Sequence, residues 1–289
     1  MSETGSRTTV ALSVRDVHKR FRRTDALRGC SFDVQRGSIT ALVGANGAGK
    51  STLMSIAVGL LEPDAGEVTI LGRRPGRRGI APGLAYVAQH KPLYRAFTVA
   101  DLLLFGEKSN TQWDNVYASR LIADAGIDPS ARVKTLSPGH RTRVALALAL
   151  GRRPDVLLLD EPLAELDPLA RRSVVRTLME DAADRGTTVV LSSHVLSEVS
   201  EIADRIVILG SGRTRLTGAL DDIVDEHYLL TGPGDPRDVV ADGTVVDTHR
   251  STHLVRGPRP TEPAGWRIEP ANLDDIVLAY LTDTAEEAA

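Results

Sequence analysis

The chain has 289 residues, of which 42% are hydrophobic and 25% are charged. This size and composition predict a globular protein with one large domain, or with a large and a small domain. The single cysteine excludes an internal disulfide bond, and the absence of about 18 consecutive apolar residues excludes a membrane-spanning helix. Because the first ten residues also lack the apolar core of a secretion signal, we expect a cytoplasmic protein.

Charge is distributed unevenly along the chain. Residues 218–289 carry 15 acidic and 5 basic side chains, whereas residues 1–217 carry 23 acidic and 30 basic ones. This change of sign predicts a boundary between a large domain at 1–217 and a small accessory domain at 218–289. The basic part fits either an anionic partner or scattered surface arginines. No basic run with interleaved aromatic residues is present, so we expect no nucleic-acid partner.

Two runs near the N-terminus alternate apolar and polar residues. Residues 12–17 and 30–34 both have this period of two, which predicts half-buried antiparallel strands. Phe21 lies between them and is flanked by charged residues, which is an unusual place for a core aromatic side chain. Two interpretations are open: a ring that stacks on a flat ligand group, and an ordinary packed or surface ring.

A glycine-rich segment follows an apolar run at 39–43, which suits a buried strand, and precedes a predicted helix at 53–61. Its sequence, G-A-N-G-A-G-K-S-T, matches the phosphate-loop pattern G-x-x-x-x-G-K-[ST]. Glycines let backbone N–H groups turn towards an anion, Lys50 can reach the β- and γ-phosphates, and the Ser51 hydroxyl can bind Mg²⁺. The segment therefore predicts a nucleotide site formed by Gly44, Ala45, Asn46, Gly47, Ala48, Gly49, Lys50, Ser51 and Thr52.

The pattern then changes from strand to helix. Strands are predicted first, at 67–70 and at 84–88, and Gln89 follows the second of them. Three helices are predicted next, at 99–105, at 113–125 and from about 137 to 151. Because these helices interrupt a strand-rich region, we expect a helical insertion over about 90–151.

The third of these helices has a sharply defined start. In the run L-S-P-G-H, Ser137 is a good N-cap and Pro138 suits the first helical position. A capped N-terminus with Gly139 beside it can also hold an anion, because its first N–H groups have no partner within the helix. Plain capping of the helix is the alternative interpretation.

Two carboxylates follow a nearly continuous apolar run at 155–159, which is typical of a parallel strand buried on both faces. A charge at the edge of a core is costly unless it is paired or binds a metal. In a chain with a phosphate loop, Asp160 would hold Mg²⁺ directly or through water, and Glu161 would polarise the attacking water as general base. A solvated loop start is the alternative.

A further polar residue follows the next predicted strand. Residues 170–185 predict an amphipathic helix and residues 187–191 a β-branched strand, after which His194 stands. In open α/β sheets, ligands bind at the carboxyl ends of the strands. We therefore expect one edge of the sheet to bring together the groups that follow four separate strands: Gly44, Gln89, Asp160 and His194.

The end of the chain carries weaker patterns. Residues 206–209 and 213–216 flank a Gly-Ser-Gly turn and predict a hairpin that closes the large domain. Beyond it, four short strands are predicted, at 228–230, 243–246, 252–255 and 266–268. A capped amphipathic helix is predicted at 272–281. Together these elements predict a small α+β appendage.

The ordered set of motifs resembles the ATP-binding subunits of ABC transporters over residues 10–218. The phosphate loop corresponds to the Walker A motif, V-L-L-L-D-E to the Walker B strand with its glutamate, and L-S-P-G-H to the signature motif. The resemblance implies an α/β fold of the P-loop NTPase type with a RecA-like core. An N-terminal antiparallel β subdomain, the helical insertion and the α+β appendage would complete it.

The resemblance also implies roles for single residues. Phe21 falls at the aromatic loop, which favours stacking on adenine, and Asp167 falls in the D-loop beside the nucleotide. The implied Mg²⁺ ligands are Ser51, Gln89 and Asp160. The implied catalytic residues are Lys50, Gln89 in the Q-loop, Glu161 and the switch histidine His194.

The resemblance further implies partners. In the family two ATP-binding domains pair head to tail, so that Ser137 and Gly139 of one copy would face the γ-phosphate of ATP on the other. With one set of motifs, this chain would form a homodimer or a paired half. A separate integral-membrane permease would be driven by closing and opening of the pair, and would contact the surface around 89–113. The protein would then be peripheral at the cytoplasmic face of the membrane.

Two departures from the family pattern stand out. Pro138 replaces the usual glycine of L-S-G-G-Q and has no N–H to donate, so contact with a phosphate in trans would change. Ala164 and Glu165 occupy D-loop positions where small or hydroxyl residues are usual. The L-S-P-G form and the C-terminal tail look most like exporters with a separate permease, such as drug, antibiotic, lipid or polysaccharide exporters.

Two rival functions are weighed against export. A soluble ABC-type ATPase of translation or DNA repair is the first, but such proteins usually carry two motif sets, or coiled-coil or zinc-binding insertions, and none is visible here. A P-loop kinase or GTPase is the second. It would need an acceptor site or a guanine-reading loop, and it leaves the segment 137–140 and His194 unexplained.

Overall fold

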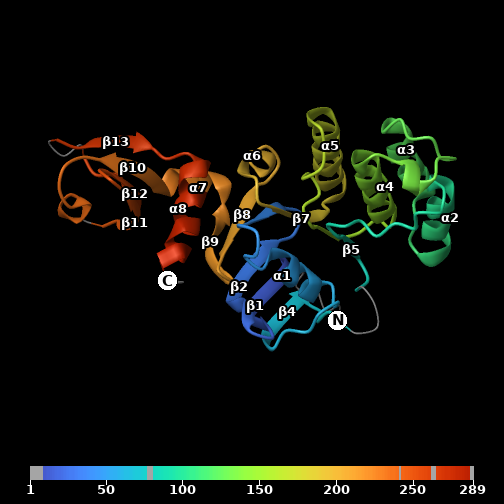
Figure 1. The fold of residues 1–289 in the computed structure, drawn as a ribbon, viewed down its shortest axis with the longest axis horizontal. Coiled ribbons are helices and arrows are strands. Elements are labelled where there is room, and N and C mark those ends of the chain that lie inside the picture. The colour runs from blue at the N-terminus through green and yellow to red at the C-terminus, as the bar shows by residue number, and fades with distance from the viewer. Residues whose placement is uncertain (1–8, 77–80, 241, 262–264, 287–289) are drawn as a thin grey trace, which may run out of the picture.

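The structure is a computed structural model that describes residues 9–76, 81–240, 242–261 and 265–286. Residues 1–8, which make up most of the N-terminal segment without a secretion signal, lie outside the described residues. The described chain forms a six-stranded sheet, a three-stranded sheet and a four-stranded sheet, with helices between them (Figure 1).

The six-stranded sheet is the centre of the molecule. Its strands stand in the order β5 (Leu84–Val87), β6 (Val156–Leu159), β7 (Thr188–Ser193), β3 (Ile39–Val43), β8 (Arg205–Gly210) and β9 (Arg213–Ala219). The first five are parallel, and β9 returns as the second arm of the predicted hairpin. Both faces are covered, which is why these strands read as continuous apolar runs.

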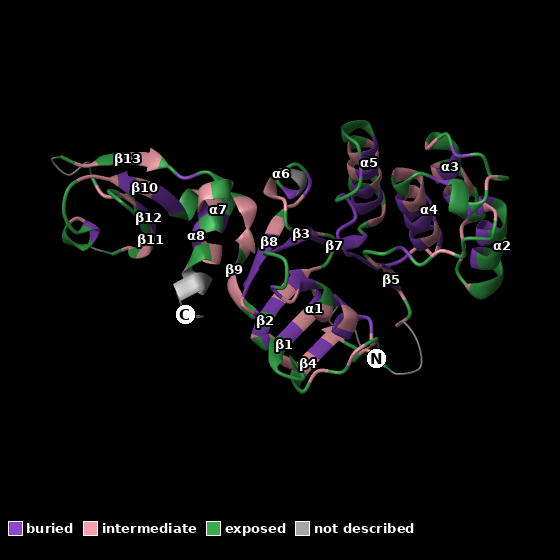
Figure 2. Cartoon of the chain, in the orientation of Figure 1, coloured by how far each residue is buried: buried purple, intermediate pink, exposed green. Residues whose placement is uncertain are grey.

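Alternate side chains of the central strands enter two different cores. Ala41 and Leu157 belong to the core that contains α4 (Pro138–Gly151), α5 (Pro168–Arg185) and part of α8 (Leu273–Glu286). Leu42 and Leu158 belong to the core that contains α1 (Lys50–Ala57) and the three-stranded sheet. All residues of β3, β6 and β7 are buried, and they form the purple centre of Figure 2. This double burial holds the strand ends, and the polar residues that follow them, in fixed positions.

The three-stranded antiparallel sheet has the order β2 (Thr24–Gln35), β1 (Val10–Phe21) and β4 (Ala65–Ile70). The two antiparallel strands predicted at 12–17 and 30–34 are confirmed, but both are longer than predicted: β1 and β2 also pair through the basic stretch between them, as far as Phe21 opposite Thr24. The register shifts between Val14 and Val17, where Asp16 has a φ of 45°. Such a bulge interrupts the period of two, so the sequence pattern stops there although the strand continues.

The helix after the phosphate loop is α1 (Lys50–Ala57), which ends earlier than the predicted 61 because Gly59 adopts a φ of 78°. The predicted insertion contains α2 (Val99–Ser109), α3 (Asn115–Asp124), a 3₁₀ turn (Val133–Thr135) and α4 (Pro138–Gly151). Helix α3 begins later than the predicted 113, because the Asp114 side chain caps it by accepting from Tyr117 N–H. The three helices share a core of their own.

Helix α5 (Pro168–Arg185) follows the Walker B strand and ends at Gly186, which has a φ of 67°. The short helices α6 (Leu196–Val199) and α7 (Leu220–Glu226) were not predicted. Both have fewer than eight residues, and neither begins with a side-chain hydrogen bond at its N-cap. They therefore lack the periodicity and the capping pattern that identify a helix in a sequence.

The predicted α+β appendage is present. Its antiparallel sheet has the order β11 (Thr244–His249), β12 (Thr252–Arg256), β10 (His227–Thr231) and β13 (Arg267–Pro270), with a 3₁₀ turn (Pro236–Asp238) and α8 (Leu273–Glu286). Helix α8 places Ile276 and Val277 in the same core as Ile206 and Ile208 of β8. The appendage is thus joined to the central sheet by a shared core. The boundary predicted at residue 217 lies inside β9 and stays a prediction.

The three parts lie in a row. Helices α2, α3 and α4 form one end of the molecule, the appendage forms the other, and the six-stranded sheet lies between them (Figure 1). Among the described residues, no helix is both long enough and apolar enough to cross a bilayer.

Candidate functional site

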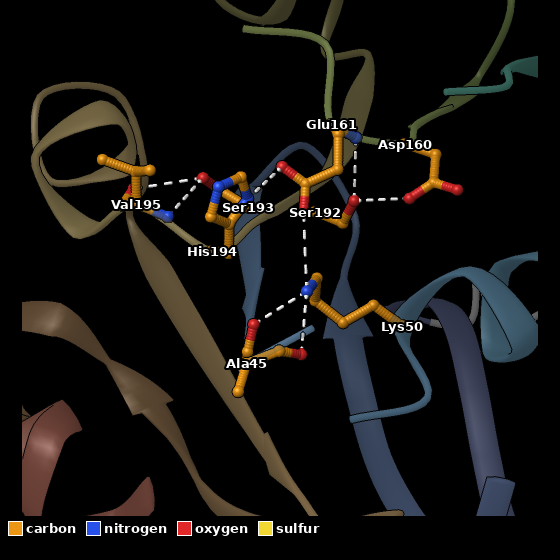
Figure 3. Close-up of polar contacts among 9 residues, drawn as sticks. Ala45, Lys50, Asp160, Glu161, Ser192, Ser193, His194 and Val195 are labelled. Atoms are coloured by element: carbon orange, nitrogen blue, oxygen red, sulfur yellow. Dashed lines mark hydrogen bonds and ion pairs between the residues drawn. The ribbon is translucent and has the colours of Figure 1, made fainter. Parts of the chain in front are cut away.

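Four neighbouring parallel strands end at the same edge of the central sheet. Strands β5, β6, β7 and β3 are adjacent, and polar or glycine residues follow each of them. The expected convergence is therefore present, because Gly44, Gln89, Asp160 and His194 all lie at the carboxyl ends of these strands. Figure 3 shows Lys50, Asp160, Glu161, Ser192 and His194 grouped at this edge.

Two glycines of the phosphate loop are required by close backbone approaches. A Cβ atom on Gly44 would lie 2.5 Å from the carbonyl oxygen of Leu209. Gly49 has a φ of 105°, and a Cβ atom there would lie 2.6 Å from the carbonyl oxygen of Ala26. The remaining loop is open to solvent at Ala45, Asn46, Gly47 and Ser51. The loop thus presents its backbone and the start of α1 to an incoming anion.

The Lys50 side chain is buried inside the loop. Its Nζ donates to the carbonyl oxygens of Gly44 and Ala45 at 2.7 and 3.3 Å, and it lies 3.4 Å from Glu161 Oε1 (Figure 3). A phosphate that enters the loop competes with these three oxygens for the ammonium group. Lys50 therefore connects the phosphate loop to the carboxylate that was predicted as general base.

Glu161 is held from three sides. Its N–H donates to Ser192 Oγ at 2.9 Å, its Oε2 lies 2.9 Å from His194 Nδ1, and its Oε1 faces Lys50. Its φ of 49° is unusual for a residue with a side chain, and such strain is kept where the surroundings enforce it. The side chain is buried, whereas that of His194 is partly exposed. The carboxylate therefore has a fixed direction at the rim of the site.

Ser192 contacts both carboxylate residues of the site, and the sequence pattern did not predict these contacts. It is fully buried, donates to Asp160 Oδ1 at 2.7 Å and accepts from the Glu161 N–H, so it links the two carboxylate residues. Burial, together with the nearby charge of Asp160, raises the pKa of the Tyr86 hydroxyl to about 12. In the sequence, Ser192 is only a hydroxyl residue at the end of an apolar strand. Its role could not be predicted, because its partners Asp160 and Glu161 follow a different strand.

The predicted Mg²⁺ ligands Ser51, Gln89 and Asp160 offer a hydroxyl, an amide and one carboxylate. In the described part of the chain, no group of three His, Cys, Asp or Glu side chains could hold a metal ion alone. Mg²⁺ commonly takes one or two carboxylates together with substrate phosphates and water. The donor set therefore fits an ion that arrives with a nucleotide, and does not fit a cage made only of protein.

The helix start at Ser137 is confirmed, but the chain does not bring it to Lys50. Ser137 Oγ accepts from the N–H of His140 at 3.1 Å, and Pro138 occupies the first turn of α4. Across the described residues, no hydrogen bond joins Ser137 or Gly139 to the residues around Glu161. Ser137 is exposed, so this N-terminus faces outward from its own chain.

Two further predicted residues lie apart from the central group. Asp167 caps α5, and its Oδ1 accepts from the N–H groups of Leu169 and Ala170 at 3.0 Å each. The hydrogen bond from the Ala170 N–H is the main reason that the pKa of the Asp167 carboxyl lies below its usual value. Phe21 ends β1 with 43% of its surface exposed, and Lys19 Nζ lies 5.7 Å from its ring centroid. Its ring is accessible to a flat ligand group.

A cleft of about 410 Å³ opens between the central sheet and α4, and Glu161 lies on its wall. Its other walls include Gln89, Lys91, Pro138, Arg141 and Glu165. The cleft thus gathers residues from the Q-loop, the signature motif and the D-loop around the predicted general base.

Comparison with known proteins shows the family of the chain. The family profile described as ABC transporter matches residues 27–164. The Nod factor export ATP-binding protein I of Rhizobium etli is 33% identical over 93% of this chain and 92% of its own length. The chain belongs to the ABC transporter family. This ABC subunit is also 36% identical to the Fe(3+) ions import ATP-binding protein FbpC 2 of Rhodococcus jostii, over 74% of the subunit and 64% of that protein.

Solved structures agree with this assignment. An ATP binding subunit of an ABC transporter has a TM-score of 0.68 and 30% identity, over 74% of this chain and 92% of that one. A dimeric cassette in a post-hydrolysis state, bound to ADP and Pi, has a TM-score of 0.64 at 22% identity and shares the fold. The predicted P-loop NTPase fold is therefore confirmed. The ABC subunit binds ATP, and its enzymatic activity is ATP hydrolysis.

Proposed function

We propose that this ABC subunit powers export through a permease that is a separate chain. Two copies pair head to tail, each ATP lies between them, and hydrolysis allows them to separate. The subunit lies at the cytoplasmic face of the membrane because the permease holds it there.

The extent of the similarity to export relatives supports the direction of transport. The Rhizobium etli relative, named as a Nod factor export protein, matches 93% of the chain. The unmatched 7% of 289 residues is about 20 residues, which is far fewer than the 72 residues from 218 to 289. Most of the appendage therefore has a counterpart in that relative. The match to the Rhodococcus jostii import protein covers only 74% of the chain.

The proposed catalytic roles rest on the contacts around Glu161. Glu161 takes the proton of the attacking water, and His194 holds the carboxylate in place through Nδ1, 2.9 Å away. Lys50 turns from Glu161 to the β- and γ-phosphates when ATP binds. Gln89, exposed on the wall of the same cleft, orients the water and the metal. Asp160, Ser51 and Gln89 would hold Mg²⁺, which would supply positive charge against the charge that develops on the phosphates.

The outward N-terminus of α4 supplies the second half of the nucleotide site. Pro138 has no N–H, and the N–H of His140 donates to Ser137 Oγ. The N–H of Gly139 is therefore the donor of this first turn that stays available for a phosphate on the other copy. Proline in place of the usual glycine at position 138 therefore has a simple consequence: the first turn offers the phosphate one N–H donor, that of Gly139, instead of two. Phe21 stacks on the adenine ring, and Asp167 holds the loop that faces the partner copy.

The permease docks beside the edge strand β5. A groove of about 230 Å³ runs between β5 and α4, and it is lined by apolar side chains such as Val87, Leu93 and Leu148. An aromatic patch of Tyr94, Phe97 and Phe105 follows it in the chain, with the Tyr94 ring 5.1 Å from Phe97 and 6.0 Å from Phe105. All three rings are exposed. An exposed apolar surface of this kind is typical of a protein interface.

We predict that a Phe97→Cys variant forms a covalent cross-link to an integral-membrane protein in native membranes. The experiment is clean because the native Cys30 is buried, and burial raises its pKa to about 11, which suppresses its reactivity. Val116→Cys is the matched control, because Val116 is 82% exposed on α3 and lies outside the groove and the aromatic patch. The adducts are identified by mass spectrometry after treatment with a thiol-specific cross-linker.

The expected adduct is a polytopic membrane protein that lacks nucleotide-binding motifs, and it is obtained with Phe97→Cys but not with Val116→Cys. An adduct with ribosomal or DNA-bound proteins would support the rival, a soluble ABC-type ATPase. Equal adducts from both variants would remove the aromatic patch from the interface.

A further inference from the structure

Lys91 is a buried lysine beside the predicted Q-loop glutamine. Only 6% of its side chain is exposed, and its backbone has a φ of 44°. Its N–H donates to the carbonyl oxygen of Ala88 at 3.0 Å, and its carbonyl oxygen accepts from the N–H of Leu93 at 2.7 Å. We name residues 88–93 the Gln89 loop. Its turn places an ammonium group inside the protein, where an unpaired charge is costly.

One carboxylate compensates this charge. Lys91 Nζ lies 3.5 Å from Glu165 Oε2, and Glu165 is the only ion-pair partner of Lys91 among the described residues. Glu165 itself is 65% exposed, so the carboxylate is solvated while the ammonium is not. Glu165 belongs to the segment 162–167 that directly follows Glu161, which we name the Glu165 loop. The unusual D-loop glutamate of this sequence therefore has a structural partner.

Lys91 stands between two hollows of the surface. It lines the cleft of about 410 Å³ that contains Glu161, and it also lines the groove of about 230 Å³ between β5 and α4. Pro92 and Leu93 line both hollows as well. A movement of the Gln89 loop that starts in the groove therefore displaces a residue that is tied to the segment after Glu161.

We propose that the Lys91–Glu165 ion pair is a positioning device that holds the Glu165 loop against the Gln89 loop, and so connects the groove between β5 and α4 to Glu161. Lys91 and Glu165 do not touch ATP in this account. They act by holding the Glu165 loop, which directly follows Glu161, in place. The inference deepens the proposed function, because it rests on that groove being the place where the permease docks.

Because Lys91 is buried and Glu165 is exposed, removing one partner is expected to differ in effect from removing the other. Glu165→Gln leaves a buried ammonium without a partner, which is worse than removing both charges. Lys91→Met removes the buried charge and keeps an apolar stem of similar length. We therefore expect kcat for ATP hydrolysis to fall about tenfold in Glu165→Gln and about threefold in Lys91→Met. In the double variant the loss stays near threefold, so that Lys91→Met partly rescues Glu165→Gln.

The same experiment measures KM for ATP, which we expect to stay within about twofold, because positioning after Glu161 affects turnover and not nucleotide capture. Arg15→Met is the matched control: it breaks the Arg15–Asp33 ion pair of 2.6 Å on the three-stranded sheet and leaves kcat unchanged. Losses that multiply in the double variant, or an unchanged kcat in Glu165→Gln, would overturn the inference.

The proposed function fails separately. A Phe97→Cys protein that gives no adduct with a membrane protein would contradict docking of the permease beside β5, whatever the double variant shows. A membrane-protein adduct with Phe97→Cys, combined with independent effects at Lys91 and Glu165, would contradict only the positioning role of the ion pair.

Discussion

Replacing Glu161 with glutamine lowers ATP turnover by about 10²–10⁴-fold, the usual contribution of a general base, while ATP still binds. Glutamine keeps the shape of the side chain but cannot take a proton from the attacking water. It also removes the negative charge that lies 3.4 Å from Lys50, so the ammonium group is easier for phosphates to recruit. We therefore expect ATP affinity to be retained and a nucleotide-bound dimer to accumulate.

Phosphate release and size-exclusion chromatography with ATP measure the two parts of this expectation. Glu269→Gln is the control, because Glu269 also makes an ion pair, with Arg267 at 2.8 Å, but lies partly exposed in the distant β13. Turnover that is unchanged in Glu161→Gln would remove Glu161 from the role of general base.

Replacing Lys50 with alanine lowers kcat/KM for ATP by about 10³-fold, as expected when a charged donor to the transferred phosphate is lost. The side chain is buried within the phosphate loop, and its Nζ is the only ammonium group that faces Glu161 among the described residues. ATP binding by calorimetry and hydrolysis by phosphate release separate a binding defect from a chemical one.

Lys108→Ala is the control for Lys50→Ala, because Lys108 is an exposed lysine on α2 and is expected to leave kcat/KM unchanged. Thermal unfolding of both variants checks that the loop still folds. A Lys50→Ala protein with normal steady-state rates would contradict the assignment of the phosphate loop.

The sequence predicted well where several candidate residues lie in the fold, because the fold leaves little choice there. Parallel strands that are buried on both faces appear in the sequence as apolar runs. Whatever the order of the strands in the sheet, the functional residues follow their carboxyl ends. Asp160, Glu161 and His194 could therefore be assigned to one edge before any contact was known. The cap at Ser137 was predicted equally well, because an N-cap followed by proline is a local signal.

The predicted bounds of helices and strands were wrong in two situations. Either the sequence pattern ends before the element does, or the pattern continues after the element has ended. The bulge at Asp16 interrupts the alternation in β1 although pairing continues to Phe21. Gly59 ends α1 inside an apolar segment that still looks helical.

Contacts between distant segments could not be predicted at all. Ser192 links Asp160 to Glu161 from another strand, and Lys91 meets Glu165 across 74 positions of the chain. A single sequence gives no information on such pairs, because neither partner follows a periodic pattern. The departure at Glu165 was visible, but its partner was not.

The most direct test of the account is the crystal structure of the Glu161→Gln protein with ATP and Mg²⁺. We expect two copies in which each γ-phosphate lies about 3 Å from Lys50 Nζ of one copy and from Ser137 Oγ or the Gly139 N–H of the other. A structure with ATP bound at Lys50, in which Ser137 and Gly139 lie far from the phosphates in every pairing of copies, would contradict the shared site.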